Sequence, residues 1–123
     1  MALLTNLLIL LVALLHLYFL VLEMFLWDKP KGMKVFGLTA QKAADTKVLA
    51  ANQGLYNGFL AAGLGWGLYQ GLVSGGSAGQ DFKVFFLLCV VVAGVYGAMT
   101  VGKKILYIQA MPAAVALALL LLV

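Results

Sequence analysis

Residues 2–22 read ALLTNLLILLVALLHLYFLVL and contain no aspartate, glutamate, lysine or arginine. A helix needs about 20 mainly apolar residues to cross the hydrocarbon core of a bilayer, and this stretch is long enough. No basic segment precedes it, it is longer than the apolar region of a signal peptide, and no small-residue cleavage site follows it. We therefore predict a retained transmembrane helix over about residues 2–27.

The composition extends this interpretation to the whole chain. Of its 123 residues, 65% are hydrophobic and 10% are charged, whereas soluble domains average about 45–50% and about 25%. A small globule cannot hide that excess, because it keeps a large share of its surface in water. A soluble enzyme, a disordered segment and a secreted disulfide scaffold are therefore excluded, although no reaction is indicated.

Three more segments have the length and composition of a span. They cover about residues 48–73, 82–101 and 105–123, so only short connections remain. The prediction is an all-α fold with a single transmembrane domain over residues 1–123, an antiparallel up-and-down four-helix bundle. Thr39 is a suitable N-cap, so the second helix is expected to begin near it. Pro112 is expected to kink or loosen the fourth.

The basic residues predict the orientation. The net charge is +4 and all eight basic residues are lysines. Seven of them lie in the connections 28–47 and 102–104, and Lys83 alone follows the other connection. Lysine-rich loops stay in the cytoplasm, which places both termini outside. The basic charge is then explained by the lipid bilayer as partner and not by nucleic acid.

Small residues predict how the helices meet. Gly54 and Gly58 are four residues apart, as are Gly63, Gly67 and Gly71. Such spacing lets helix backbones approach closely in lipid. The second helix is therefore expected to be the main packing element, within one subunit or between subunits of a homo-oligomer.

Polar residues within the spans predict a site. His16 and Glu23 share one face of the first helix. At ~1.5 Å per residue most intramembrane polar groups fall in the cytoplasmic half, and the opposite half has few, chiefly Asn6 and Gln70. Ionisable groups inside a membrane tend to mark function, whereas amides and tyrosines also serve as interhelical hydrogen bonds and interfacial anchors. The predicted cytoplasm-facing polar pocket has eight candidate ligand-binding residues: Glu23, Asn52, His16, Asn57, Tyr56, Gln53, Tyr96 and Gln109.

Metal chemistry is not expected. Cys89 is the only cysteine and His16 the only histidine, so one subunit cannot form a disulfide or a typical zinc site. Neither a cofactor nor a set of catalytic residues is indicated.

Three functions remain open. The first is a multi-pass membrane protein that binds a small polar or amphipathic ligand in the polar pocket. The second is an enzyme on a lipophilic substrate, with Glu23 or His16 as general acid or base. The third is an accessory or structural subunit whose glycine-rich second helix docks on another membrane protein.

Two stretches carry a family resemblance. Residues 16–27 (HLYFLVLEMFLW) and 52–65 (NQGLYNGFLAAGLG) resemble a family of small bacterial four-span membrane proteins catalogued as domain of unknown function number 1304. The resemblance covers essentially the whole chain. It implies a location in the bacterial inner membrane and no established activity.

The architecture is also similar to the membrane-associated eicosanoid and glutathione metabolism superfamily. That fold has four spans, outside termini and a polar second helix. The likeness implies a trimer with glutathione bound between subunits, and Asn52 is the position that carries over. The second helix here lacks the arginine and glutamate of that pattern, which argues against glutathione as the ligand.

Overall fold

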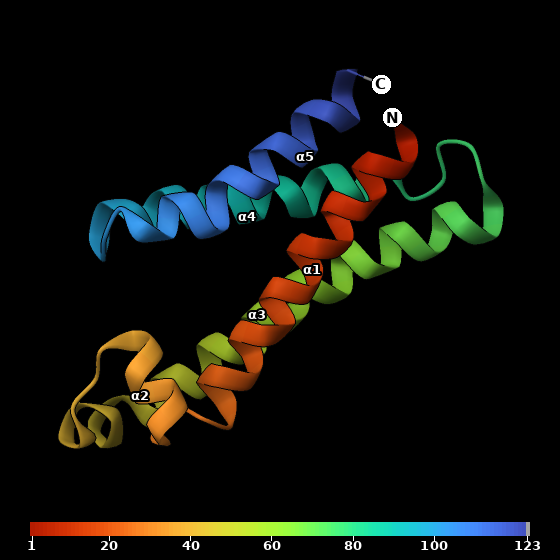
Figure 1. The fold of residues 1–123 in the computed structure, drawn as a ribbon. Helices are drawn as coiled ribbons and strands as arrows, with labels where there is room; N and C mark the ends of the chain where they lie inside the picture. Colours follow the sequence, from red (N-terminus) through yellow and green to blue (C-terminus); the bar gives the residue numbers. More distant parts are fainter. Residues whose placement is uncertain (123) are drawn as a thin grey trace. The chain divides into compact units, whose positions relative to one another are not determined.

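All regular elements among residues 1–122 are helices (Figure 1). The computed structural model describes residues 1–122, and no strand occurs among them, so the all-α prediction is confirmed. The α-helices are α1 (Ala2–Met24), α2 (Pro30–Phe36), α3 (Ala40–Ser74), α4 (Gln80–Thr100) and α5 (Met111–Leu122), and a π-helical turn η1 (Leu106–Ala110) directly precedes α5.

The chain forms two compact units. The first unit comprises Met1–Ala13 together with residues 62–122, and the second unit is Leu14–Ala61. Helices α1 and α3 each contribute one part to each unit. The two units are described separately below.

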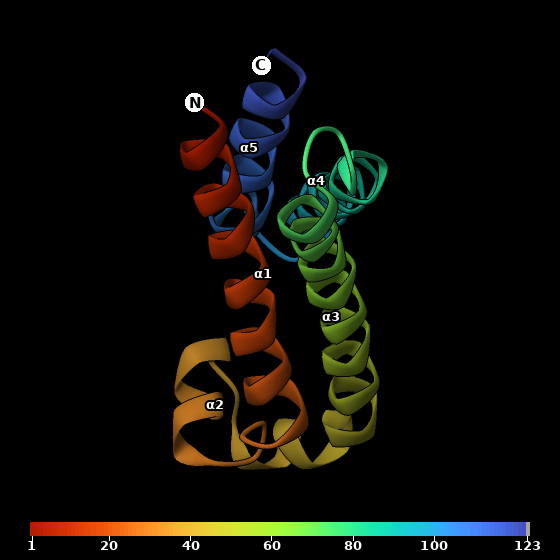
Figure 2. The same cartoon turned by 90° about the vertical axis from the view of Figure 1, so that its right-hand side faces the viewer.

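The second unit contains the connection between α1 and α3 (Figures 1 and 2). Its short helix α2 starts at Pro30. Proline has no N–H, but the first N–H groups of a helix lack an intrahelical acceptor, so no hydrogen bond is lost there. Gly37 follows the helix in the left-handed conformation that commonly ends helices. The following helix α3 is capped by Thr39, whose hydroxyl oxygen accepts a hydrogen bond from the Lys42 N–H at 3.1 Å. Local capping thus separates α2 from α3 with a short corner.

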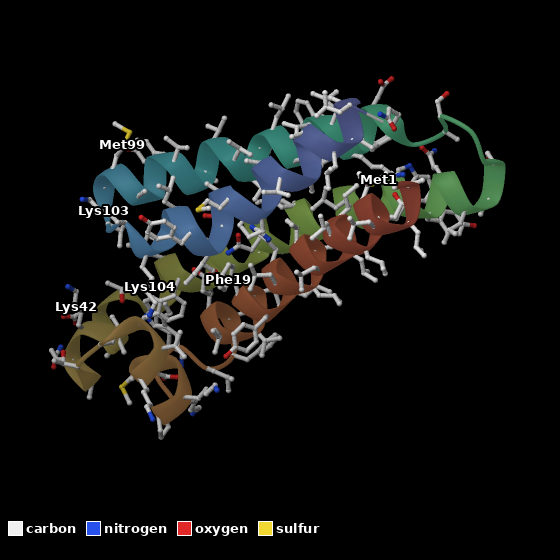
Figure 3. All side chains as sticks on the ribbon, turned by 45° about the horizontal axis from the view of Figure 1, so that its top comes forward. Met1, Phe19, Lys42, Met99, Lys103 and Lys104 are labelled. Atoms are coloured by element: carbon white, nitrogen blue, oxygen red, sulfur yellow. The ribbon has the colours of Figure 1, made fainter. Side chains whose placement is uncertain are left out.

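The first unit packs α4 against η1 and α5. The backbones are close, because a Cβ at Gly94 would lie 2.6 Å from the Ala110 nitrogen. In η1 the Met111 N–H donates to the Leu106 carbonyl, five residues back. Pro112 follows at once and has no N–H to donate, and its ring would crowd the carbonyl of an α-helical turn. The predicted loosening at this proline is therefore found as a π-helical turn. Figure 3 shows Lys103 and Lys104 in the short connection before it.

Two helices are long and apolar enough to cross a membrane, α1 and α4. The segment Leu106–Leu122 is apolar but shorter, and α3 interrupts its apolar residues with Asn52, Gln53 and Asn57. Length and composition therefore favour membrane association.

Helix α1 buries polar as well as apolar side chains and exposes many apolar ones. Its buried positions include three polar residues: Thr5, His16 and Glu23. Large apolar side chains on the same helix are exposed, with Leu3 at 73% and Leu7 at 53% of their full accessible surface. The buried face of α1 also contains Ile9, Val12, Ala13 and Leu22, so this helix has a mixed buried face and a largely apolar exposed one.

Candidate functional site

Polar contacts fasten the α1–α3 connection to the first turns of α3. The Trp27 indole N–H donates to the Thr46 hydroxyl at 3.0 Å, and the Trp27 ring packs on Phe36 of α2 with centroids 4.8 Å apart. Asp28 and Lys47 form an ion pair at 2.9 Å. These contacts fix the register of the end of α1 against the start of α3.

Glycines then bring α1 and α3 into close contact within the second unit. A Cβ at Gly54 would lie 2.7 Å from Met24 Cγ and 3.0 Å from Glu23 Cβ. A Cβ at Gly58 would lie 2.7 Å from a methyl of Leu20. A methyl group at Gly54 would crowd side-chain and backbone atoms of α1, and one at Gly58 would displace the end of the Leu20 side chain. The pair predicted to allow close packing therefore does so here against α1 of the same chain.

At this contact Glu23 meets Asn57. The Asn57 side-chain amide donates a hydrogen bond to Glu23 Oε1 at 2.5 Å. Glu23 is only 6% exposed and Asn57 is partly buried. The contact joins residues 34 positions apart, and each lies on the face of its helix that packs against the other. We call this contact the Glu23–Asn57 pair.

The second carboxyl oxygen of Glu23 keeps some accessible surface. Every buried side-chain nitrogen or oxygen in the described residues has a hydrogen-bond partner, and the hydrogen bond of Glu23 is on Oε1. Oε2 is therefore not sealed within the helix contact. The ion pair found within residues 1–122 joins Lys47 and Asp28, so no lysine of this range neutralises Glu23. A buried carboxylate in this state is an acceptor with capacity for a proton, a cation or a further donor.

His16 lies on the same face of α1 and is fully buried. Its ring meets Phe19 edge-on, with centroids 5.6 Å apart and an interplanar angle of 75°. The predicted grouping of His16 and Glu23 on one helix face is found, with His16 fully buried and Glu23 keeping 6% of its accessible surface.

The other polar residues of α3 point elsewhere. Asn52 and Gln53 are exposed, and Tyr56 is 60% exposed with its ring against Phe59 at 6.0 Å. Within the second unit the structure thus brings Glu23 and Asn57 into contact, whereas Asn52, Gln53 and Tyr56 lie on the outer surface.

Two candidates belong to the first unit. Tyr96 is 68% exposed and lines a shallow apolar groove of about 470 Å³ along one face of α4, together with Phe85, Cys89 and Val92. Gln109 lies in η1 and is half-buried. Among residues 1–122 no group of three or more His, Cys, Asp or Glu is placed to hold a metal ion.

In the first unit, the sequence analysis did not predict the contact between Lys83 and Asn6. Lys83 is 7% exposed, and its ammonium donates to Asn6 Oδ1 at 3.1 Å. Its position near the start of a span was the available signal, because a lysine at that depth must either reach outward or find a partner.

Comparison with known proteins identifies relatives but no activity. The family described as "Protein of unknown function (DUF1304)" matches residues 10–121. The uncharacterized protein YpaA of Lactococcus lactis subsp. lactis (strain IL1403) is 32% identical over 111 residues, which is 89% of this chain and 89% of that protein. No solved structure shows a significant match. The Glu23–Asn57 pair lies inside the matched residues, and the chain belongs to the DUF1304 family of proteins of unknown function.

Proposed function

We propose that the protein is a multi-pass protein of the bacterial inner membrane and that its Glu23–Asn57 pair binds the polar group of a small polar or amphipathic ligand. The observation that carries the proposal is a buried carboxylate with one oxygen held by an amide and, within residues 1–122, no lysine paired with it. Burying such a group is costly unless it is paired. A ligand that supplies a hydrogen-bond donor or a positive charge would complete it.

The membrane part of the proposal is supported by the outer surfaces of the helices. Besides the leucines of α1, α4 exposes Phe85 at 60% and Met99 at 80%. Figure 3 labels Met99. Exposed apolar surface on this scale is typical of contact with lipid or another protein. Water would penalise it by about 25 cal/mol for each Å².

Besides α1 and α4, the proposed spans are α3 and the segment 106–122. At 1.5 Å per residue, the 35 residues of α3 extend ~52 Å, more than the ~30 Å of a bilayer core. The first turns of α3, which carry Lys42 and Lys47, would then project into the cytoplasm. The segment 106–122 extends ~26 Å, near the lower limit for a span.

Orientation follows from the exposed lysines. Lys31, Lys34, Lys42, Lys103 and Lys104 are all exposed. Because segments rich in lysine remain on the cytoplasmic side, the proposed orientation has both termini outside and Glu23, at the end of α1, in the cytoplasmic half.

Cysteine labelling tests this orientation. Ser77→Cys and Lys31→Cys, each in a Cys89→Ala background, place a thiol at an exposed position that a membrane-impermeant maleimide can reach from its own side. The Ser77→Cys protein is expected to react on intact cells, and the Lys31→Cys protein only after lysis. The opposite result would reverse the orientation. Labelling of both proteins on intact cells, or of neither before lysis, would contradict the proposed spans.

Binding is tested with an amphipathic cation. We expect octylammonium to raise the unfolding temperature of the protein in mild detergent. Its ammonium group would pair with the Glu23 carboxylate, and its alkyl group would contact the apolar surroundings. The neutral 1-octanol is the matched control and should have little effect. Equal stabilisation by both compounds would attribute the effect to the alkyl chain and contradict the proposal.

Variants separate ligand binding from structural support. Glu23→Gln keeps a hydrogen-bonding side chain at the helix contact but removes the charge, so the protein should fold and lose the response to octylammonium. Asn52→Ala on the exposed face of α3 should keep the response. A Glu23→Gln protein with the full response would show that the pair only joins α1 to α3.

A further inference from the structure

A second polar site lies in the first unit, around the buried ammonium of Lys83. We propose that it binds an oxyanion of the phosphate class, either free or as a lipid headgroup. This site shares no residue with the Glu23–Asn57 pair, and the proposal does not depend on the function proposed above.

The lysine is held in a slot on α3 that a larger side chain would close. A Cβ at Gly67 would lie 2.9 Å from Lys83 Cγ and 3.0 Å from the Gly79 carbonyl oxygen. A Cβ at Gly71 would lie 3.4 Å from Lys83 Nζ. The aliphatic part of the lysine thus packs along two glycines, which brings its charge inward instead of leaving it at the surface.

The charge of Lys83 is met by a neutral group. Its ammonium has three donors, and the recorded acceptor is Asn6 Oδ1 at 3.1 Å. Within residues 1–122 no carboxylate forms an ion pair with it, and Asp81, the nearest acid in sequence, is exposed. A buried cation is costly without a counter-charge, and among the described residues none supplies one to Lys83.

A hollow of about 390 Å³ opens beside this ammonium. A water molecule occupies about 30 Å³ in the liquid, so the hollow can hold a much larger group. About half of its lining is polar, and the described residues that line it include no carboxylate: Thr5, Asn6, Ser77, Gln80 and Lys83 line it together with Ala2, Gly76 and Leu120.

Several polar groups at the hollow can donate a hydrogen bond to an anion, whereas the Thr5 hydroxyl already donates to the Met1 carbonyl. Asn6 turns its oxygen to Lys83 because an ammonium can only donate, which leaves its NH₂ group able to donate elsewhere. Ser77 and Gln80 add a hydroxyl and an amide. Helix α4 begins here at Gln80, and its N-cap Gly79 makes no side-chain hydrogen bond. Asp81 in the first turn offsets part of the positive charge of the helix end, so the attraction for an anion rests mainly on Lys83.

Unfolding of the intact protein in a neutral detergent tests the site. Sodium phosphate is compared with sodium chloride at equal ionic strength, and phosphatidylglycerol with an uncharged glycosyl diacylglycerol in mixed micelles. We expect a rise of a few degrees in unfolding temperature with phosphate, with phosphatidylglycerol, or with both. A response to phosphate assigns a free oxyanion, and a response to phosphatidylglycerol alone assigns a lipid headgroup.

Variants decide whether Lys83 is responsible. Lys83→Gln removes the charge and should abolish the rise, whereas Lys103→Gln makes the same charge change at an exposed position and should keep it. If Lys83→Gln does not fold, Ser77→Asp places a negative charge at an exposed position of the hollow and should also abolish the rise. Absence of any rise in the native protein, or a rise that persists in these variants, would overturn the proposal.

Discussion

The Glu23–Asn57 pair and the Lys83–Asn6 contact each use an asparagine to hydrogen-bond a buried ionisable group, a carboxyl group in one case and an ammonium in the other. In the second unit the Asn57 amide donates to a buried carboxylate, and in the first unit the Asn6 oxygen accepts from a buried ammonium. An asparagine can do either because it carries both groups. Glycines on α3 allow close contact in both places, through Gly54 in one unit and Gly67 in the other.

The two contacts differ in how confined the charge is. Glu23 has a short side chain pressed against α3, and a backbone oxygen of Leu20 lies only 3.2 Å from where a Cβ of Gly54 would be. Lys83 has a long, flexible stem and lies beside a hollow. The carboxylate therefore depends on its single partner more than the ammonium does, and the variants below are designed to break or sharpen that difference.

Asn57→Leu is expected to have the largest effect. It leaves the buried Glu23 carboxylate without its hydrogen bond, which should lower the free energy of unfolding by about 3 kcal/mol. The Glu23→Leu/Asn57→Leu double variant removes both polar groups and should recover most of that loss. Denaturant unfolding of the purified protein measures both. A double variant as unstable as Asn57→Leu would show that the space, and not the unpaired charge, is responsible.

Gly54→Ala should cost about 2 kcal/mol, because the added methyl group meets Met24, Glu23 and the Leu20 backbone. Gly65→Ala on the same helix is the matched control, since nothing lies within 4 Å of its Cβ position. It should stabilise the helix by about 0.5–1 kcal/mol through a lower backbone entropy in the unfolded chain. Equal effects of the two substitutions on unfolding would contradict the close α1–α3 contact.

Asn6→Leu should cost only about 1 kcal/mol, the typical worth of one hydrogen bond. The Lys83 stem can move its charge toward the hollow once its partner is lost. Comparison of its unfolding free energy with that of Asn57→Leu tests the contrast directly. A loss as large as that of Asn57→Leu would mean that the Lys83 ammonium is equally confined.

Helical periodicity predicted the contacts of α1 better than those of α3. His16 and Glu23 are seven residues apart, almost two full turns, so they share a face whichever way the helix is turned. Asn52 and Asn57 are five residues apart, which separates them by about 140° around the helix. Both cannot face α1, and the structure turns Asn57 inward and Asn52 outward. Depth along a helix was readable from the sequence, but the direction of each side chain depended on where Gly54 and Gly58 allow approach.

Lys83 shows that counting the lysines on each side of the predicted spans does not predict which of them is buried. The sequence places it at the start of the predicted span 82–101, as the one lysine on the side opposite the other seven. The structure buries it instead, because the slot at Gly67 and Gly71 accepts its stem. Nothing local to residues 80–86 predicts that slot, since it is formed by a segment of α3 more than ten residues earlier in the chain.

The smallest effect is expected at the ion pair between Asp28 and Lys47 in the second unit. Unlike the two buried contacts, this pair is accessible to solvent. The hydrogen bond from Lys47 lowers the pKa of Asp28 below its ordinary value of 3.8. Because the folded state holds the carboxylate ionised, the stabilisation is present above that ordinary value and is lost as the pH falls through the lowered pKa. The difference in unfolding temperature between the native protein and Asp28→Asn should therefore shrink as the pH falls below about 4, and added salt should reduce it at neutral pH because water reaches the pair. A difference that is independent of both pH and salt would mean that Asp28 acts through packing, in which case a solvent-accessible pair would contribute in the same way as the buried asparagine contacts.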